Sequence, residues 1–183
     1  MTSHVHEAGY RFCPQCGGRL APQVVKRGEA PRPVCASCGH VVYIDPKVAV
    51  GTIIRNGGGE LALVRRSIEP GYGKWVFPGG YVDRGEELHA AAVREALEES
   101  NLRIRIDDLT GLYSYPGQTT IIIVYAATAV GGSLRADDES LEAAWFEAEN
   151  LPWPELAFRS TSDALRDYLA RSSGGGTASS GAA

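Results

Sequence analysis

The chain has 183 residues, of which 44% are apolar and 22% are charged, a size that suits one medium domain with a small appendage. The formal net charge of −4 argues against a general nucleic-acid binder held by phosphate contacts, so no nucleic-acid partner is expected. No apolar run approaches bilayer length, so no membrane partner is expected either. The polar start, Met1 to Arg11, lacks the apolar stretch of a signal peptide, and we expect a cytoplasmic protein with reduced thiols.

Composition divides the chain into three regions. Residues 10–43 contain all four cysteines together with many prolines and glycines, and we expect a small separate domain there. Residues 44–171 alternate between strand-like and helix-like segments, as a main domain would. Residues 172–183 contain only Ser, Gly, Ala and Thr, and such a tail cannot bury enough apolar surface to order itself. We therefore expect a disordered tail.

The four cysteines form two Cys-x-x-Cys pairs, Cys13 with Cys16 and Cys35 with Cys38, separated by eighteen residues. Two such pairs supply the four thiolates of a tetrahedral zinc site at a spacing typical of structural zinc. Two disulfides in a secreted protein are the alternative, which the missing signal peptide disfavours. A closed site of four thiolates leaves no position for a catalytic water. His40 is a candidate for a substitute ligand, but with four cysteines present we expect it to be a solvated loop residue.

The main domain begins with segments typical of a β-hairpin. Val48–Ile54 is β-branched and apolar, which predicts a buried strand. Asn56–Gly59 predicts a tight turn, and Glu60–Arg66 alternates as a return strand. Trp75–Val82 is short and extended, and it is interrupted by Pro78–Gly79–Gly80.

The second half of the main domain is predicted to add two helices and three strands. Glu86–Ser100 has high helical propensity, and Asn101 can take the left-handed position that ends a helix. The remaining predicted elements are strands at Leu109–Tyr115, Thr119–Val130 and Ala143–Phe146, a turn at Pro116–Gly117, and an amphipathic helix at Phe158–Arg171. A mixed sheet flanked by helices, in the α/β class, accommodates these elements.

Three acids on the first predicted helix indicate what the main domain could bind. Glu95, Glu98 and Glu99 fall within one third of the helix circumference and near its C-terminal end, where the helix dipole disfavours negative charge. Like charges at these spacings repel, so the face requires a cation, and a hard divalent ion such as Mg²⁺ prefers oxygen ligands. The alternative is a solvated acidic face paired with arginines, which is the commoner case for an arbitrary helix.

The segment before the helix decides between these two interpretations. Gly80 is followed after five residues by Glu86, which is followed after seven residues by Arg94–Leu102, with the sequence REALEESNL. This pattern resembles the Nudix box, which has a glycine, a spaced glutamate, and then Arg–Glu–aliphatic–x–Glu–Glu–x–Gly–aliphatic. Every charged position is filled. Two positions depart from the pattern, Asn101 in place of glycine and the small Ala96 at the aliphatic position.

The resemblance implies a Nudix α/β/α sandwich with a mixed sheet, and Mg²⁺ or Mn²⁺ bound against a diphosphate. It implies that Glu98 and Glu99 are metal ligands and that Glu95 is a further ligand or the catalytic base. It also implies that a backbone carbonyl of Gly79 or Gly80 completes the metal site.

The resemblance assigns supporting roles to three further residues of the box and of a later loop. Glu86 is expected to join the metal network or to pair with Arg94, and Arg94 is expected to orient the acids. Relatives often draw one more carboxylate from a later loop, and Glu142 is expected to supply it here, with Glu139 as the rival.

Substrate contacts are expected from arginines and aromatic residues outside the box. Arg65 and Arg66 end a predicted strand and are candidate phosphate ligands, although one of them is expected to be a surface charge. Tyr81 and Tyr115 are candidates for stacking on an adenine or flavin ring, as is Tyr113, although each alone is more often an ordinary strand aromatic. Gln118 lies where relatives place substrate-contacting residues.

The resemblance extends beyond the box to most of residues 10–171. The matching segments are Tyr43–Val50, Gly73–Tyr81, Gly117–Thr119, Glu139–Glu142 and Leu156–Ser160. With the four cysteines, they are similar to the zinc-ribbon Nudix group that includes FAD and ADP-ribose pyrophosphatases. The Ser–Gln–Pro–Trp–Pro–Phe–Pro signature of the NADH branch is absent. The resemblance therefore implies a hydrolase that cleaves the diphosphate of FAD or ADP-ribose by water attack on phosphorus, releasing AMP.

Two other functions stay open. One is a pyrophosphatase that removes damaged nucleoside triphosphates. The other is a non-enzymatic module that senses a ligand or docks through the ribbon, although such sensors tend to lose the acids that this chain retains. The expected partner is a small nucleotide substrate, and a homodimer is left open.

Overall fold

The computed structural model describes residues 10–174 of the chain. It divides into two compact units, one up to Pro46 and the other from Lys47 onward, and each is described by itself. Among the described residues, no helix is long and apolar enough to cross a membrane.

The N-terminal unit is built on a two-stranded antiparallel hairpin that the sequence did not predict. Strand β1 (Leu20–Gln23) pairs with β2 (Arg32–Cys35). Cys13 and Cys35 are buried, whereas the unit has few other buried apolar side chains. A unit this small depends on a cross-link or a metal for its stability.

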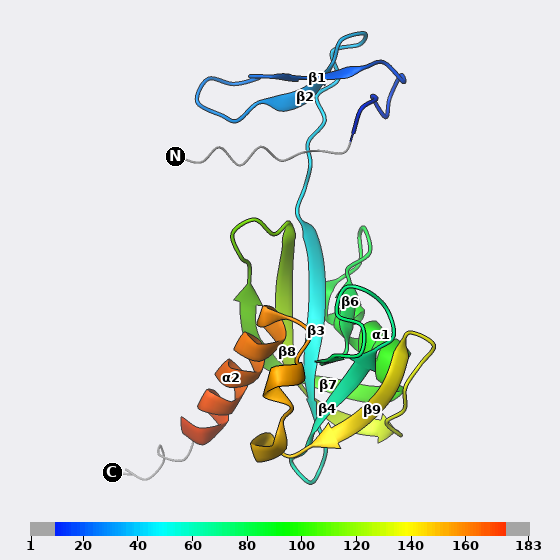
Figure 1. Ribbon diagram of the computed structural model, residues 1–183, viewed down its shortest axis with the longest axis vertical. Coiled ribbons are helices and arrows are strands. Elements are labelled where there is room, and N and C mark those ends of the chain that lie inside the picture. The colour runs from blue at the N-terminus through cyan, green and yellow to red at the C-terminus, as the bar shows by residue number, and fades with distance from the viewer. Residues whose placement is uncertain (1–9, 175–183) are drawn as a thin grey trace, which may run out of the picture. The chain divides into compact units, whose positions relative to one another are not determined.

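The larger unit contains one mixed sheet and two α-helices (Figure 1). Its elements are β3 (Lys47–Arg55), β4 (Leu61–Arg66), β5 (Trp75–Val76), β6 (Gly79–Tyr81), α1 (Leu88–Ser100), β7 (Leu102–Tyr113), β8 (Thr120–Gly132), β9 (Ser140–Phe146), the short 3₁₀ helices η1 (Ala148–Asn150) and η2 (Trp153–Glu155), and α2 (Arg159–Gly174). The strand order is β5-β4-β3-β8-β7, with β6 paired to β3 and β9 paired to β4. Only the pairing of β3 with β8 is parallel, so the expected mixed sheet is confirmed.

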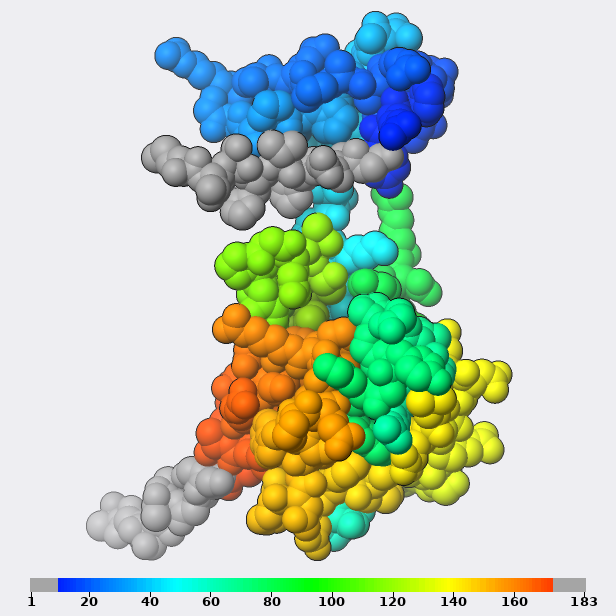
Figure 2. Space-filling view, viewed as in Figure 1, coloured from blue at the N-terminus to red at the C-terminus, as the bar shows by residue number. Residues whose placement is uncertain are grey.

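The two helices cover opposite faces of this sheet (Figure 1). Successive residues of a strand point to opposite faces. On β3, Ile53 packs in the cluster that contains Leu165 of α2, whereas Ile54 packs in the cluster that contains Ala96 of α1. Helix α2 and the segment with the two 3₁₀ helices form one face of the unit's surface (Figure 2). The α/β/α sandwich is therefore confirmed.

Several boundaries differ from the prediction, among them the start of β7 and the end of α2. Strand β7 begins at Leu102, seven residues before the expected start at Leu109. Its first residues alternate between apolar and charged, and Leu102 and Ile104 are buried against the sheet face that α1 covers. Helix α2 continues to Gly174, so residues 172–174 of the expected tail are helical, and 175–183 lie outside the described residues.

Candidate active site and zinc site

The four cysteine sulfurs gather at one point of the N-terminal unit, all within 4.8 Å of one another. The Sγ atom of Cys16 lies 3.5 Å from the Sγ atom of Cys35 and 3.3 Å from that of Cys38, and the Sγ atoms of Cys13 and Cys38 are 3.8 Å apart. Zinc–sulfur bonds of about 2.3 Å place the four sulfurs of a tetrahedral site about 3.8 Å apart. The donor set therefore fits Zn²⁺. Within residues 10–174 this is the only cluster of potential ligand atoms so close together, and His40 is not part of it.

Backbone groups around the sulfurs support the same conclusion. The N–H of Gln15 donates to Cys13 Sγ and the N–H of Ser37 donates to Cys35 Sγ, both at 3.4 Å. Such bonds stabilise a thiolate. A Cβ on Gly18 would lie 2.9 Å from Cys35 Sγ, so only glycine lets the backbone pass this close to the sulfur.

The backbone of β6 lies directly against the acids of α1. The N–H of Gly79 donates to Glu99 Oε2 at 2.8 Å. A Cβ on Gly79 would collide with the backbone of Val50 on β3, and a Cβ on Gly80 would lie 2.5 Å from Glu95 Oε2. A side chain is excluded at Gly79 and would displace the Glu95 carboxylate at Gly80, so the glycines bring main-chain atoms to the carboxylates.

Arg94 joins three of the box acids through one guanidinium group. Its Nε and Nη2 atoms donate to the two oxygens of Glu86, each at 2.8 Å. Its Nη1 atom donates to Glu95 at 2.7 Å and to Glu98 at 3.0 Å. The paired hydrogen bonds from Arg94 hold the pKa of Glu86 at about 2. The pairing of Glu86 with Arg94 is thus observed, and one positive charge faces three negative charges.

The carboxyl group of Glu99 has a pKa well above that of an ordinary glutamate. Burial raises its pKa to about 7, opposed by the Gly79 N–H, while the like charges of Glu95 and Asp137 raise it further and Arg66 lowers it. Burial also raises the pKa of Glu95, whose side chain is only 13% exposed, although Arg94 opposes this effect. The carboxylates of α1 carry more negative charge than Arg94 neutralises, and they lie next to the backbone of Gly79 and Gly80. A hard divalent cation would stabilise these charges, so the residues fit Mg²⁺ or Mn²⁺.

Asp137 in the loop before β9 is a residue that the sequence analysis missed. Its carboxylate accepts a hydrogen bond from the N–H of Glu139 at 3.1 Å, and its charge acts on Glu99. Glu139 contacts the neighbouring segment through its backbone carbonyl, which accepts from the N–H of Ser67. No spacing signal distinguishes the three consecutive acids of this loop, so sequence alone could not select Asp137.

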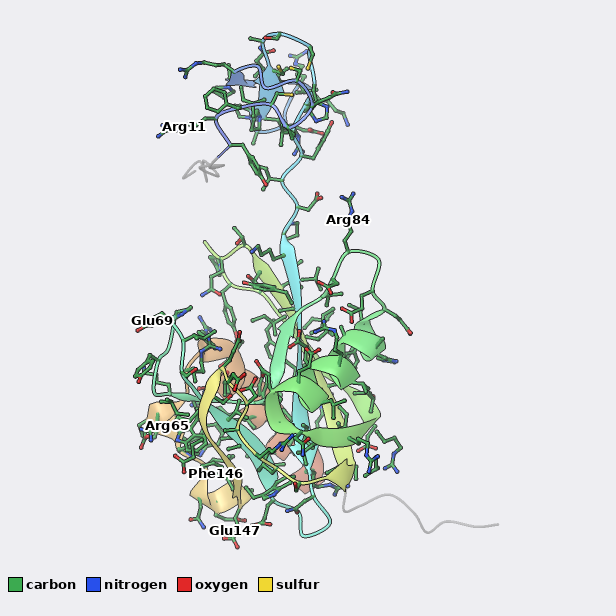
Figure 3. The ribbon with its side chains drawn as sticks, turned by 90° about the vertical axis from the view of Figure 1, so that its right-hand side faces the viewer. Arg11, Arg65, Glu69, Arg84, Phe146 and Glu147 are labelled. Carbon is green, nitrogen blue, oxygen red and sulfur yellow. The ribbon has the colours of Figure 1, made fainter. Side chains whose placement is uncertain are left out.

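Glu142 and the two arginines occupy the paired strands β4 and β9. Glu142 lies opposite Arg65 in the register and forms an ion pair with it at 3.6 Å. Arg65 Nε also donates to the carbonyl of Gly73 at 2.8 Å, so this arginine, labelled in Figure 3, is held by two partners. Arg66 lies over the ring of Phe158 at 5.2 Å and influences the pKa of Glu99. Of the two arginines, Arg66 is the one whose charge reaches the box acids.

Two of the predicted substrate contacts are exposed. The side chain of Tyr81 is 53% exposed, and the Nζ atom of Lys47 lies 4.7 Å from its ring centroid. Gln118 is exposed in the turn after β7, where its N–H donates to the carbonyl of Tyr115. Tyr81 also accepts a hydrogen bond from Arg94 through its backbone carbonyl, which places this residue beside the box.

Tyr113 and Tyr115 connect β7 with α2. The hydroxyl of Tyr113 donates to Asp167 at 2.8 Å, and the hydroxyl of Tyr115 donates to Asp163 at 2.9 Å. These four residues help to line a cavity of about 360 Å³, to which none of the box acids contributes. Both tyrosines therefore have a structural function in joining sheet and helix, and the cavity is separate from the acidic cluster.

Comparison with known proteins identifies both units. The NUDIX domain family matches residues 45–168, and the Nudix N-terminal zinc-ribbon family matches residues 11–44. An ADP-ribose pyrophosphatase of Methanocaldococcus jannaschii is 32% identical over 157 residues, which cover 84% of this chain and 86% of that protein. The NAD-capped RNA hydrolase NudC of Pseudomonas aeruginosa is 31% identical over 166 residues, which cover 90% of this chain but only 57% of that protein.

Solved structures agree with the sequence comparison. The crystal structure of a NUDIX hydrolase from Nitrosomonas europaea matches with a TM-score of 0.85 at 34% identity, covering 91% of this chain and 94% of that one. The matches to both family descriptions and the shared box establish the class of reaction. The chain belongs to the Nudix family and is a hydrolase of the pyrophosphatase class with an N-terminal zinc ribbon.

Proposed function

We propose that this enzyme cleaves the diphosphate bond of ADP-ribose, or of a closely related nucleoside diphosphate linked to a second group, and releases AMP. The observation that carries the proposal is the excess of negative charge on α1 against the backbone of Gly79 and Gly80 in β6. The similarity to the Methanocaldococcus jannaschii ADP-ribose pyrophosphatase over 84% of the chain supports the substrate class. We assign catalysis to residues 44–171 and the structural zinc to residues 10–43.

The metal-binding role falls to the acids of α1. Glu98 and Glu99 would hold the divalent ion, with Glu95 and a carbonyl of Gly79 or Gly80 as further ligands. When bound, such an ion neutralises diphosphate oxygens and lowers the pKa of a bound water. Glu98 is 57% exposed and is held by a single hydrogen bond from Arg94, so it can turn towards an arriving ion.

The attacking water must lose a proton to a nearby base, and we assign this role to Glu95. Its Oε1 atom is held by Arg94, and its Oε2 atom lies beside Gly80. Because burial raises the pKa of this carboxyl, it binds a proton more strongly than an exposed glutamate does. Arg94 is then a positioning residue, because it fixes the base and the metal ligands relative to each other.

Residues around the box would recognise the substrate. We propose Arg66 rather than Arg65 as a phosphate ligand, because the charge of Arg66 acts on Glu99, whereas Arg65 forms an ion pair with Glu142. Asp137, rather than Glu142, is proposed as the late carboxylate, because its charge acts on Glu99. The exposed ring of Tyr81 offers a surface on which a base can stack.

A dinucleotide such as NAD is the second candidate substrate. The similarity to the Pseudomonas aeruginosa enzyme, named for NAD-capped RNA, favours it, whereas the absent NADH signature disfavours it. FAD shares the same AMP half, but it requires room for the isoalloxazine ring.

The test is to compare kcat/KM for ADP-ribose, FAD, NADH and dGTP under one Mg²⁺ concentration. We expect ADP-ribose to give the highest value and to yield AMP with ribose 5-phosphate, because its second group can contribute binding energy that positions the reacting phosphorus. Glu98→Gln protein purified in parallel controls for contaminating activity. A highest value for dGTP would move the enzyme to the triphosphate-cleaving class.

A further inference from the structure

The zinc-ribbon unit differs in charge from the rest of the protein. Its described residues up to Pro46 contain five basic side chains and two acidic ones, and a bound Zn²⁺ with four thiolates adds −2, so their net charge is +1, whereas the formal charge of the whole chain is −4. The basic residues are Arg11, Arg19, Lys26, Arg27 and Arg32. The expectation of no nucleic-acid partner used the charge of the whole chain, which does not show that these five basic side chains lie within one small unit.

The same unit exposes three aromatic rings. Tyr10, Phe12 and Tyr43 are 57%, 54% and 61% exposed. These three rings lie at the surface of a unit in which the four cysteine sulfurs gather at one point.

Arginines lie over two of the exposed rings. The guanidinium of Arg19 is 5.5 Å from the ring centroid of Phe12, and that of Arg32 is 4.8 Å from the centroid of Tyr43. Each pair offers a flat ring for stacking and, beside it, a cation for a phosphate. The repetition of this pair within one small unit distinguishes it from an isolated exposed ring.

Three of the basic side chains are free to meet an anion. Lys26 and Arg32 both form ion pairs with Glu29, at 3.6 Å and 3.5 Å. Arg11, Arg19 and Arg27 have no ion pair among the described residues. Arg11 projects from the surface of the ribbon unit (Figure 3).

We infer that the zinc ribbon binds single-stranded RNA, with bases stacked on Phe12 and Tyr43 and phosphates held by the free arginines. Single strands expose base faces, and a basic surface with interleaved aromatic rings recognises them with little sequence preference. A duplex hides those faces, and an acidic protein would occupy the cations without using the rings. The choice of RNA over DNA rests on the proposed function, whose substrates are ribonucleotides.

The test uses the full chain with zinc bound and a 3′-fluorescent RNA of about twelve nucleotides, measured by fluorescence anisotropy. Phe12→Ala and Tyr43→Ala should each weaken binding by between about 5-fold and about 150-fold, the range for loss of one stacked base. Phe12→Trp should restore binding. Tyr72→Ala, at an equally exposed tyrosine of the larger unit, should leave the affinity unchanged.

Salt dependence tests the phosphate contacts. Three neutralised phosphates give a slope of log K against log salt of about −2, so binding should weaken about 20-fold between about 50 and 200 mM salt. Arg19→Ala should reduce this slope by about 0.7, whereas Arg55→Ala, at an exposed arginine of the larger unit, should not change it.

Four results would overturn the inference: unchanged affinity in both alanine variants, equal binding of duplex RNA, tighter binding of DNA of the same sequence, or equal competition by polyglutamate. Zinc content near one per chain in every variant shows that the ribbon remains folded. Hydrolysis of free ADP-ribose is measured in parallel. Hydrolysis without RNA binding refutes this inference alone, and RNA binding without hydrolysis refutes the proposed function alone.

Discussion

The Arg94 guanidinium allows the charge balance of the candidate active site to be tested with one substitution. It donates four hydrogen bonds to the carboxylates of Glu86, Glu95 and Glu98, and one to the carbonyl of Tyr81. Arg94→Lys keeps the positive charge but removes the planar group that holds both oxygens of Glu86. The variant therefore separates the geometry of the clamp from its charge.

The expected loss of stability follows from these contacts. A hydrogen bond between charged groups contributes about 1.5–3 kcal/mol. A lysine can keep about half of the contacts of Arg94, and the 30% exposure of this side chain lets solvent screen the remainder. We expect Arg94→Lys to lower the free energy of unfolding by about 2 kcal/mol. Arg84→Lys, at an arginine that projects from the loop before α1 (Figure 3), should change it by less than about 0.5 kcal/mol.

The effect should depend on pH in a defined direction. Arg94 holds the pKa of Glu86 at about 2, below the ordinary value of 4.5. A carboxylate with a lowered pKa stabilises the fold above its unfolded-state pKa, and this contribution is lost as the pH falls through its folded-state pKa. The difference in stability between wild type and Arg94→Lys should therefore be constant above about pH 4.5 and shrink towards about pH 2.

Urea unfolding followed by tryptophan fluorescence measures this difference. All three tryptophans, Trp75, Trp145 and Trp153, lie in the larger unit, so their signal reports that unit alone. In the same variant, kcat should fall about 10-fold to 100-fold, because the base and the metal ligands lose their relative positions. If Arg94→Lys matches Arg84→Lys in both measurements, Arg94 does not position these acids.

Four further outcomes are expected. EDTA should abolish turnover, and Mg²⁺ or Mn²⁺ should restore it. Glu98→Gln should lower kcat at least about 100-fold without loss of fold, because the amide relieves like-charge repulsion. Near-normal turnover of this variant would exclude Glu98 as a ligand. Elemental analysis should find about one zinc per chain, and Cys13→Ser should lose it, whereas two disulfides by thiol titration would contradict the zinc site. Asp137→Asn should reduce kcat more than Glu139→Gln does, and the reverse order would restore Glu139 as the late acid. Asn101→Gly should keep the free energy of unfolding within about 1 kcal/mol of the wild-type value but should lower kcat. Unchanged turnover would show that Asn101 is not a positioning residue.

Segments with a strong local pattern were predictable from the sequence. The apolar β-branched run of β3 and the helical propensity of α1 both lie within two residues of their predicted bounds. The first half of β7 was missed although Leu102, Ile104 and Ile106 alternate with charged residues, because no element was assigned between Asn101 and Leu109. The β1–β2 hairpin was missed because metal ligation, rather than an apolar pattern, organises that unit.

Those residues of the candidate site that lie near one another in the sequence were predictable. Glu95, Glu98 and Glu99 share one helix face by spacing alone, and the resemblance allowed for the pairing of Glu86 with Arg94. The position of Asp137 depends instead on the register between β4 and β9, which shifts at a bulge between Arg65 and Arg66. A one-residue change of register moves a side chain to the other face of a strand, so sequence spacing cannot select among adjacent acids.

The departure from the Nudix pattern at Asn101 explains how this late loop is held near the box. Asn101 takes the left-handed conformation, with φ of 57°, and its N–H donates to the carbonyl of Leu97 as a helix cap does. Its side chain does what a glycine could not, because Nδ2 donates to the carbonyl of Ser133 at 3.0 Å. The N–H of Arg135 donates to the carbonyl of Ser100 at 3.2 Å, which gives the loop a second attachment to the end of α1. The residue that weakens the match to the box therefore fixes the loop that brings Asp137 to Glu99.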